Sequence, residues 1–127
     1  MIEQYLVSEL GTIPTLAGQC YPAAAPVGDL EPPFCIYTRV AGEIQRDMSG
    51  EPVFFRDVYR LDLAGDDMDA LCLLEQEVIS TLCKECVEFG DDIYIFSVTA
   101  APGAPDGFDL VLENHQRSVS CTITYWR

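Results

Sequence analysis

The final stretch of the chain, residues 117–127, constrains the fold more than any other because its apolar and polar side chains alternate without a break. The apolar positions are Val119, Cys121, Ile123 and Tyr125, and the polar positions between them are Ser118, Ser120, Thr122 and Thr124. Successive side chains of a β-strand point to opposite faces of a sheet. This period of two therefore predicts a strand whose two faces differ in polarity.

Two earlier segments, residues 34–41 and 53–63, predict a long β-hairpin. Both are rich in β-branched and aromatic residues, which are enriched in strands. The alternating apolar positions of the second segment are Tyr59, Leu61 and Leu63. Between the two segments, residues 47–50 read Asp-Met-Ser-Gly, which is typical of a turn. We expect the tip of this hairpin to stand clear of the domain.

The remaining elements follow from apolar spacing and from turn residues. In chain order they are a helix over residues 2–10 ended by Gly11, a proline- and glycine-rich loop over 12–33, a helix capped by Asp66 or Asp67 that runs to about Glu88, and strands over 93–101 and 108–112. The chain has 127 residues, of which 49% are hydrophobic, so we expect a single domain over residues 1–127 with a core of its own.

The chain is strongly acidic, and its charge is unevenly distributed. The formal net charge is −14, and residues 61–116 hold thirteen acidic residues against Lys84 alone, a balance of −12. Four of the seven basic residues lie within residues 39–60. An acidic protein repels the phosphate backbone of DNA, so tight DNA binding is disfavoured. Mimicry of DNA, and free passage of DNA past the protein, are both compatible with this charge.

No segment is typical of membrane insertion or secretion. No apolar run approaches the roughly 18 residues that a membrane-spanning helix needs. Residues 1–10 lack a basic start and include two acidic residues, so they do not read as a signal peptide. We expect synthesis in the cytoplasm, where thiols stay mostly reduced.

The motif Cys83-Lys84-Glu85-Cys86 has a spacing that zinc sites and thiol oxidoreductases use. On a helical wheel at about 100° per residue, Cys72, Cys83 and Cys86 fall within the apolar stripe of the second predicted helix. A structural zinc site needs four ligands, and a redox cysteine favours the N-terminal end of a helix. We therefore expect these cysteines to pack in the core, with no metal site.

Signatures of catalysis are missing elsewhere in the sequence. It contains no nucleophile elbow, no phosphate loop and no dinucleotide-binding glycine motif. The only histidine, His115, is expected in a polar turn before the last strand. Helix capping explains the acidic residues Asp66, Asp67 and Asp69. We expect a protein that is not an enzyme and that uses no cofactor.

Three consecutive residues of the second predicted helix do not fit a solitary domain. Glu75 falls inside the apolar stripe, where an ionised carboxylate is costly unless it is paired, and Leu73 and Leu74 fall on the polar side. One interpretation is that Glu75 reaches out along the helix edge and that the exposed leucines have no special role. The other is an arginine partner for Glu75 and a subunit contact for Leu74, with Leu73 beside it. The sequence leaves both open.

Several stretches form an ordered pattern along the chain. They are Tyr-Pro at 21–22 with Ala-Pro at 25–26, Pro-Phe-Cys-Ile-Tyr at 33–37 with Arg-Val-Ala-Gly at 39–42, Phe-Arg-Asp-Val-Tyr-Arg-Leu-Asp-Leu-Ala-Gly at 55–65, and the closing strand that ends Trp-Arg at 126–127. In this order they resemble the small tail-terminator, or tail-completion, proteins of long-tailed bacteriophages and prophages, which join heads to tails. The chain departs from the family pattern in its extra cysteines, its acidity, and Leu63 in place of a common aromatic residue.

The resemblance implies an α+β fold, a mostly antiparallel β-sheet with a long hairpin and helices packed on one face. It also implies a ring of six copies in the virion, at the head-proximal end of the tail tube, which ends tube growth and joins the tail to the head. The implied partners are further copies of the chain, the tail-tube protein and the head-completion protein of the connector. DNA would pass through this ring without specific binding, because an acidic lumen does not adhere to phosphates. The resemblance implies no contact with a membrane.

Two other classes of function stay open. An acidic protein that mimics DNA and inhibits a host DNA-binding protein would use the acidic segment 61–116, although the predicted strands, the loop and the arginine cluster do not favour this class. A thiol or metal enzyme is the third class, and the position of the cysteines on the helical wheel disfavours it.

The hairpin tip holds the residues that we expect to contact a neighbouring ring. Met48 and Phe54 are large apolar residues beside a turn, where a solitary domain has little core to offer them, and Arg46 and Arg56 flank them. Apolar residues combined with arginine are typical of interface centres. Alternation along the strand places Phe55 on the inner face of the sheet and Phe54 on the outer face.

Overall fold

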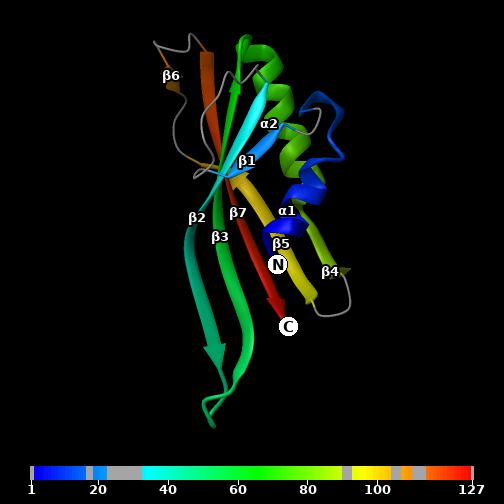
Figure 1. Ribbon diagram of the computed structural model, residues 1–127, viewed down its shortest axis with the longest axis vertical. Helices are drawn as coiled ribbons and strands as arrows, with labels where there is room; N and C mark the ends of the chain where they lie inside the picture. Colours follow the sequence, from blue (N-terminus) through cyan, green and yellow to red (C-terminus); the bar gives the residue numbers. More distant parts are fainter. Residues whose placement is uncertain are drawn as a thin grey trace.

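The protein is described here by a computed structural model that covers residues 2–16, 19–22, 33–89, 93–103, 107–109 and 114–126. Its elements are α1 (Ile2–Leu10), the 3₁₀ helix η1 (Pro14–Leu16), β1 (Cys20–Pro22), β2 (Phe34–Arg46), β3 (Pro52–Gly65), α2 (Met68–Leu82), β4 (Lys84–Phe89), β5 (Ile93–Pro102), β6 (Gly107–Asp109) and β7 (Asn114–Trp126). Within these ranges the strands form one seven-stranded sheet in the order β1-β2-β3-β7-β5-β4, and β6 pairs with β7 beside it. Both helices cover the same face of the sheet (Figure 1).

The expected α+β class, with a mostly antiparallel sheet, is confirmed. β1 runs parallel to β2, and all the other strand pairs in the described ranges are antiparallel. β7 lies in the middle of the sheet, between β3 and β5, and carries the predicted alternation. Its buried positions are Val119, Cys121, Ile123 and Tyr125. The serines and threonines between them are exposed or half-buried on the other face.

The core lies between the sheet and the helices. α1 contributes Ile2, Tyr5, Leu6 and Leu10; α2 contributes Leu71, Leu74, Val78 and Leu82; the sheet contributes Tyr59, Leu61, Leu63, Ile95 and Val98 together with the apolar side of β7. Each fully buried aliphatic side chain stabilises the fold by about 1.5–3 kcal/mol relative to an exposed one. The helix predicted over residues 2–10 is confirmed. It ends where Gly11 donates its backbone N–H to the Val7 carbonyl at 2.8 Å.

The helix α2 begins as predicted but ends earlier. The Asp67 carboxylate caps it by accepting a hydrogen bond from the Asp69 backbone N–H at 3.2 Å. The helix stops at Leu82, because the backbone of Cys83 is already extended. The prediction that α2 continues to about Glu88 was therefore wrong.

Residues 84–89 form the edge strand β4, which pairs with β5. Val87 and Phe89 are half-buried against the core, opposite Ile95 and Ile93. Their spacing of two residues is that of a strand, in which every second side chain faces the core. The sequence of residues 84–89 is short enough to fit the period of a helix or that of a strand. The contacts of Val87 and Phe89 with the sheet favour the strand.

This change of structure overturns the prediction for the Cys-Lys-Glu-Cys motif. Cys83 and Cys86 are both exposed, whereas Cys72 on α2 is half-buried. Cys86 has a φ of +55°, a left-handed conformation that interrupts the edge strand. The two motif cysteines are thus surface residues and contribute no core packing.

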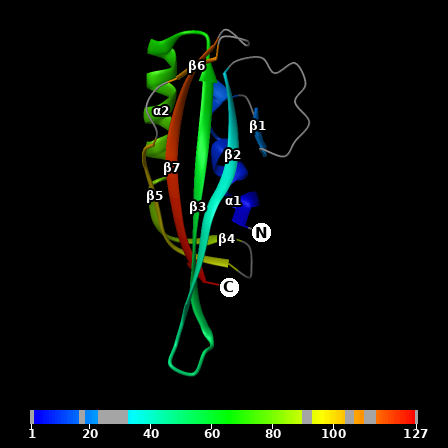
Figure 2. The same ribbon diagram turned by 90° about the vertical axis from the view of Figure 1, so that its left-hand side faces the viewer.

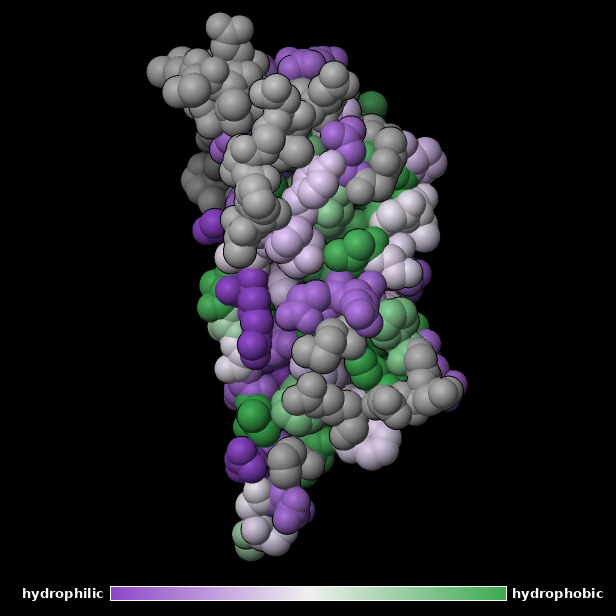
Figure 3. All heavy atoms as spheres, viewed as in Figure 1, coloured by the Kyte–Doolittle hydropathy of each residue, from purple (hydrophilic) through white to green (hydrophobic). Residues whose placement is uncertain are grey.

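The strands β2 and β3 form the predicted hairpin, which is longer than the sequence indicated. Their pairing runs from Phe34 opposite Ala64 to Arg46 opposite Pro52. The far end of the hairpin extends beyond the helices and the other strands (Figures 1 and 2). In the space-filling view this end is a narrow arm on which hydrophilic and hydrophobic residues lie side by side (Figure 3).

Three smaller predictions have mixed outcomes. His115 lies in β7 opposite Gly65, so its predicted place in a turn was wrong; the strand begins earlier than expected, at Asn114. The strand predicted over 108–112 is present as β6, and residues 110–113 lie outside the described ranges. The segment 12–33, predicted to be a loop, contains η1 and β1, while residues 17–18 and 23–32 also lie outside the described ranges.

Candidate interaction surface

One aspartate organises the turn at the tip of the hairpin. The Asp47 carboxylate accepts hydrogen bonds from the Ser49 backbone N–H at 2.9 Å, from the Ser49 hydroxyl at 2.6 Å and from the Glu51 backbone N–H at 3.0 Å. These bonds, that of the Ser49 side chain foremost, lower the pKa of Asp47. Gly50 completes the turn at a φ of +90°, which glycine adopts without steric cost. The tip is a preformed structure.

Four of the predicted contact residues lie on this arm, namely Arg46, Met48, Phe54 and Arg56. Met48 projects from the turn with its side chain fully exposed. Arg46 donates from Nη1 to the Gly50 carbonyl at 2.9 Å, and Arg56 Nη1 lies 3.6 Å from Glu43 Oε2 in an exposed ion pair. Exposed ion pairs contribute little to stability. The Arg56 guanidinium can therefore exchange this ion pair for another contact at little cost.

The two phenylalanines of β3 lie on opposite faces of the sheet, as predicted. The Phe55 ring stacks on Tyr125 with centroids 5.5 Å apart and packs against the core. The Phe54 ring meets Phe96 edge-on, with centroids 6.4 Å apart. Phe54 is half-buried and so less available than a free tip residue.

Phe54 belongs to a cluster on the open face of the sheet that we call the outer aromatic patch. Its members are Phe54, Tyr94, Phe96 and Trp126. Tyr94 and Phe96 meet edge-on with centroids 5.3 Å apart, and Tyr94 pairs with Trp126 across β5 and β7. Trp126 is 53% exposed and Phe96 is 43% exposed. Sequence reasoning missed this patch because residues 93–96 are apolar at every position, so the sequence does not distinguish the two faces of β5 there.

A buried carboxylate joins the root of the hairpin to the rest of the sheet. Asp57 of β3 is 4% exposed and accepts hydrogen bonds from Arg39 Nη2 at 3.2 Å and from the Tyr125 hydroxyl at 3.0 Å. A buried carboxylate is tolerated only with such partners. Because Arg39 lies on β2 and Tyr125 on β7, the network connects three adjacent strands just before the hairpin leaves the sheet.

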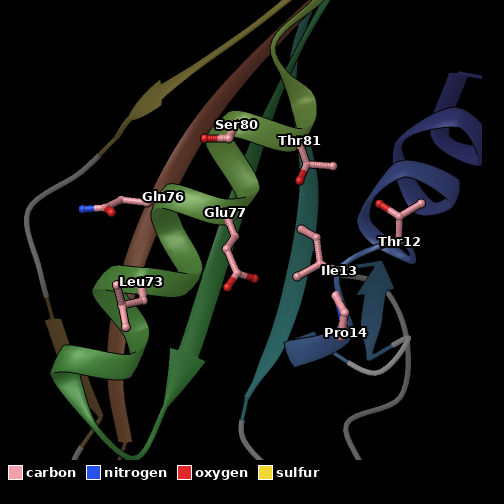
Figure 4. Close-up of a pocket in the computed structure, with 8 residues that line it drawn as sticks. All are labelled: Thr12, Ile13, Pro14, Leu73, Gln76, Glu77, Ser80 and Thr81. Atoms are coloured by element: carbon pink, nitrogen blue, oxygen red, sulfur yellow. The ribbon is translucent and has the colours of Figure 1, made fainter.

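Leu73 is 62% exposed on the outer side of α2, as predicted. It lines a groove of about 410 Å³ between α2 and the segment that follows α1 (Figure 4). The groove is lined by Thr12, Ile13, Pro14, Leu73, Gln76, Glu77, Ser80 and Thr81. Its lining combines apolar surface with hydroxyl groups, one amide and one carboxylate.

The neighbours of Leu73 lie differently. Leu74 is 1% exposed in the core, so its predicted exposure, and with it a subunit contact through this residue, was wrong. The helical wheel placed the apolar stripe around three cysteines, and two of them, Cys83 and Cys86, lie outside α2. The buried face of the helix is centred on Leu71 and Val78 instead, and it includes Leu74. Glu75 is buried and Arg117 is its partner, which agrees with the second of the two interpretations that the sequence left open.

Among the described residues, no group of three or more His, Cys, Asp or Glu side chains could hold a metal ion. In the same part of the chain, no helix is long and apolar enough to cross a membrane.

Comparisons with known proteins place the chain by its fold. No family model matches it, and no curated protein matches its sequence. Among solved structures, it is similar to a chain of the structure titled "Virion of native gene transfer agent (GTA) particle". The TM-score is 0.68 at 11% sequence identity, with 96% of this chain and 92% of that chain covered. The two chains therefore share an α+β fold across nearly their whole lengths.

Proposed function

We propose that the protein is a structural component of a virion, and that it forms a ring at the head-proximal end of a phage-type tail. There it ends growth of the tail tube and joins the tail to the head connector. The observation that carries the proposal is the likeness in fold to a chain of the gene transfer agent virion, at a TM-score of 0.68 over nearly both whole chains. The ordered resemblance to tail-terminator proteins supports the same role.

The distribution of exposed apolar residues supports assembly into a ring. Copies in a ring meet through two different surfaces, so that each copy contributes one surface to each neighbour. Leu73 with its groove lies on the helix side of the sheet, and the outer aromatic patch lies on the opposite side. Exposed aromatic clusters are typical of protein contact sites. We assign these two surfaces to contacts between adjacent copies.

The hairpin tip is assigned to a contact with the neighbouring ring, which is the tail-tube protein or the head-completion protein. Met48 is fully exposed there. Because the turn is already formed, binding would cost less conformational entropy than the ordering of a flexible loop. The net charge of −14 fits a ring around DNA, because an acidic lumen lets DNA move without adhering to it. The virion would then be the site of action, and the host cytoplasm the site of synthesis.

Sedimentation tests the ring directly. The purified protein is analysed at micromolar concentration, alone and with the tail-tube protein encoded by the same genome. We expect a closed oligomer, with about six copies, in at least one of the two conditions. Leu73→Ser should weaken this oligomer, whereas Val40→Ser, which changes an equally exposed apolar residue of β2 that belongs to neither surface, should not. A strict monomer under both conditions would count against the proposal.

A further inference from the structure

Two of the six free cysteines face each other at one edge of the sheet. Cys20 of β1 is the direct register partner of Cys35 of β2, and the two thiols are hydrogen-bonded. Side chains of directly opposed residues lie on the same face of a sheet, and neighbouring strands are about 4.7–4.9 Å apart. Disulfides join residues whose Cα atoms are roughly 4.4–6.8 Å apart. The pair can therefore be bridged with little movement of the backbone.

The two thiols differ in reactivity. Cys35 is fully buried, whereas Cys20 is half-buried. The hydrogen bond from the Cys35 thiol lowers the pKa of Cys20. The same bond, with burial second, raises the pKa of Cys35 well above its usual value. Cys20 is thus the thiol that forms a thiolate more readily and that a reagent from solution reaches first.

We propose that Cys20 and Cys35 are a modification site at which a small-molecule disulfide, such as oxidised glutathione, converts the dithiol into an intramolecular disulfide. The Cys20 thiolate attacks one sulfur of glutathione disulfide, which forms a mixed disulfide and releases one glutathione thiolate. Cys35 then loses its proton to solvent, and its sulfur attacks the Cys20 sulfur and displaces the second glutathione. The protein loses two electrons, and one glutathione disulfide is reduced to two molecules of glutathione.

The disulfide would fasten the strand β1, which is held to the sheet by a short ladder. β1 pairs with β2 through Cys20 opposite Cys35, Tyr21 opposite Ile36 and Pro22 opposite Tyr37. The new bond closes a loop over residues 20–35, and such a loop restricts the unfolded chain. The melting temperature should rise by roughly 10 °C on oxidation. This inference does not depend on the proposed role in a virion.

Tryptic digestion gives a direct readout of this bond. The first basic residue of the chain is Arg39, so Cys20 and Cys35 lie together in peptide 1–39 with no other cysteine. The native protein is incubated with oxidised glutathione, alkylated, digested and analysed by mass spectrometry. We expect peptide 1–39 to be lighter by two hydrogen atoms and to carry no alkyl group. If both its thiols stay free while Cys83 and Cys86 acquire glutathione, the proposal is wrong.

Two variants test the order of the steps. Cys35→Ser should retain glutathione on Cys20, because the second thiol is missing. Cys20→Ser should leave the buried Cys35 unmodified in the native protein. If Cys35→Ser fails to fold, Cys35→Ala provides the same readout with an apolar residue in the core. Glutathione on Cys35 in the Cys20→Ser variant, or a disulfide that links peptide 1–39 to another peptide, would overturn the assignment. Cys83→Ser is the control and should oxidise like the wild type.

Discussion

Arg117 of β7 and Glu75 of α2 form an ion pair between the central strand and the helix, with Nε and Oε2 2.6 Å apart. Glu75 is 7% exposed, and the Arg117 side chain is 25% exposed. Arg117 also donates a hydrogen bond to the Cys72 sulfur. The arginine partner that one interpretation gave Glu75 is confirmed, although the subunit contact that it gave Leu74 is not, and the ion pair fastens the helical layer to the sheet.

Replacing Glu75 by glutamine should lower the free energy of unfolding by about 1–3 kcal/mol, because Arg117 would lose its charged partner in a largely buried position. Glu85→Gln, an exposed glutamate of β4, is the control and should change stability by no more than about 0.5 kcal/mol. Urea unfolding followed by circular dichroism measures both variants. If both variants changed the free energy of unfolding equally, the ion pair between Glu75 and Arg117 would not be a buried contact that stabilises the fold.

Cys86 provides a test of the corrected end of α2. Its φ of +55° favours glycine, so Cys86→Gly should raise the free energy of unfolding by about 0.5–1 kcal/mol. Cys86→Val should lower it by about 1–2 kcal/mol, because a β-branched side chain strains that conformation. If residue 86 were instead in a buried helix, the glycine variant would be the less stable of the two. The urea concentrations at the midpoints of unfolding show which of the two variants is the more stable.

The buried thiol of Cys121 predicts a loss of stability at alkaline pH. Burial raises the pKa of Cys121 from 9.0 to about 12. Between these values the unfolded chain loses a proton that the folded chain keeps, so the free energy of unfolding falls as the pH rises. This group contributes a slope of up to about 1.4 kcal/mol per pH unit above pH 9. Urea unfolding should show a smaller slope in Cys121→Ala; an unchanged slope would contradict the assignment.

Trp126 is the single tryptophan and reports on the outer aromatic patch. With 53% of its surface exposed, it should emit as a hydrated indole in the isolated protein. If adjacent copies cover the patch, the emission should shift to shorter wavelength as the oligomer forms, because the ring leaves water. Phe96→Ser should weaken both the oligomer and the shift. An oligomer seen by sedimentation with unchanged emission would exclude the patch from the contact.

Much of the sheet could be predicted from the sequence because alternation has a strict period. The pattern of β7 and the inward positions Tyr59 and Leu61 of β3 were correct for this reason. The same parity places Asp57 inward, so its burial was readable from the sequence, although its partners Arg39 and Tyr125 were not. These two partners lie on other strands, and the alternation within one strand does not show which residues of a neighbouring strand lie opposite it.

The wrong predictions arose where the pattern of apolar residues is short or does not distinguish two structures. Residues 83–89 fit a helix as well as a strand, and only contact of Val87 and Phe89 with β5 settles the choice. Including Cys83 and Cys86 in the wheel rotated its centre and displaced Leu74 from the core. The outer aromatic patch was missed because residues 93–96 of β5 are all apolar and do not show which face is buried. Of the candidate surface, the exposure of Met48 and Leu73 was therefore predictable, and the patch was not.

We propose that this protein joins a tail to a head, and electron microscopy of particles tests this proposal most directly. Particles are produced from the genome that encodes the chain, with its gene intact, disrupted, or altered to Met48→Ser. Met48 is fully exposed, so Met48→Ser should leave the stability of the isolated domain within about 0.5 kcal/mol of the wild type.

Disruption should yield heads without tails together with tails of irregular length, and supplying the wild-type gene in trans should restore joined particles. Met48→Ser should yield folded protein with heads and tails that fail to join. Joined particles with tails of normal length in the absence of the gene would contradict the account.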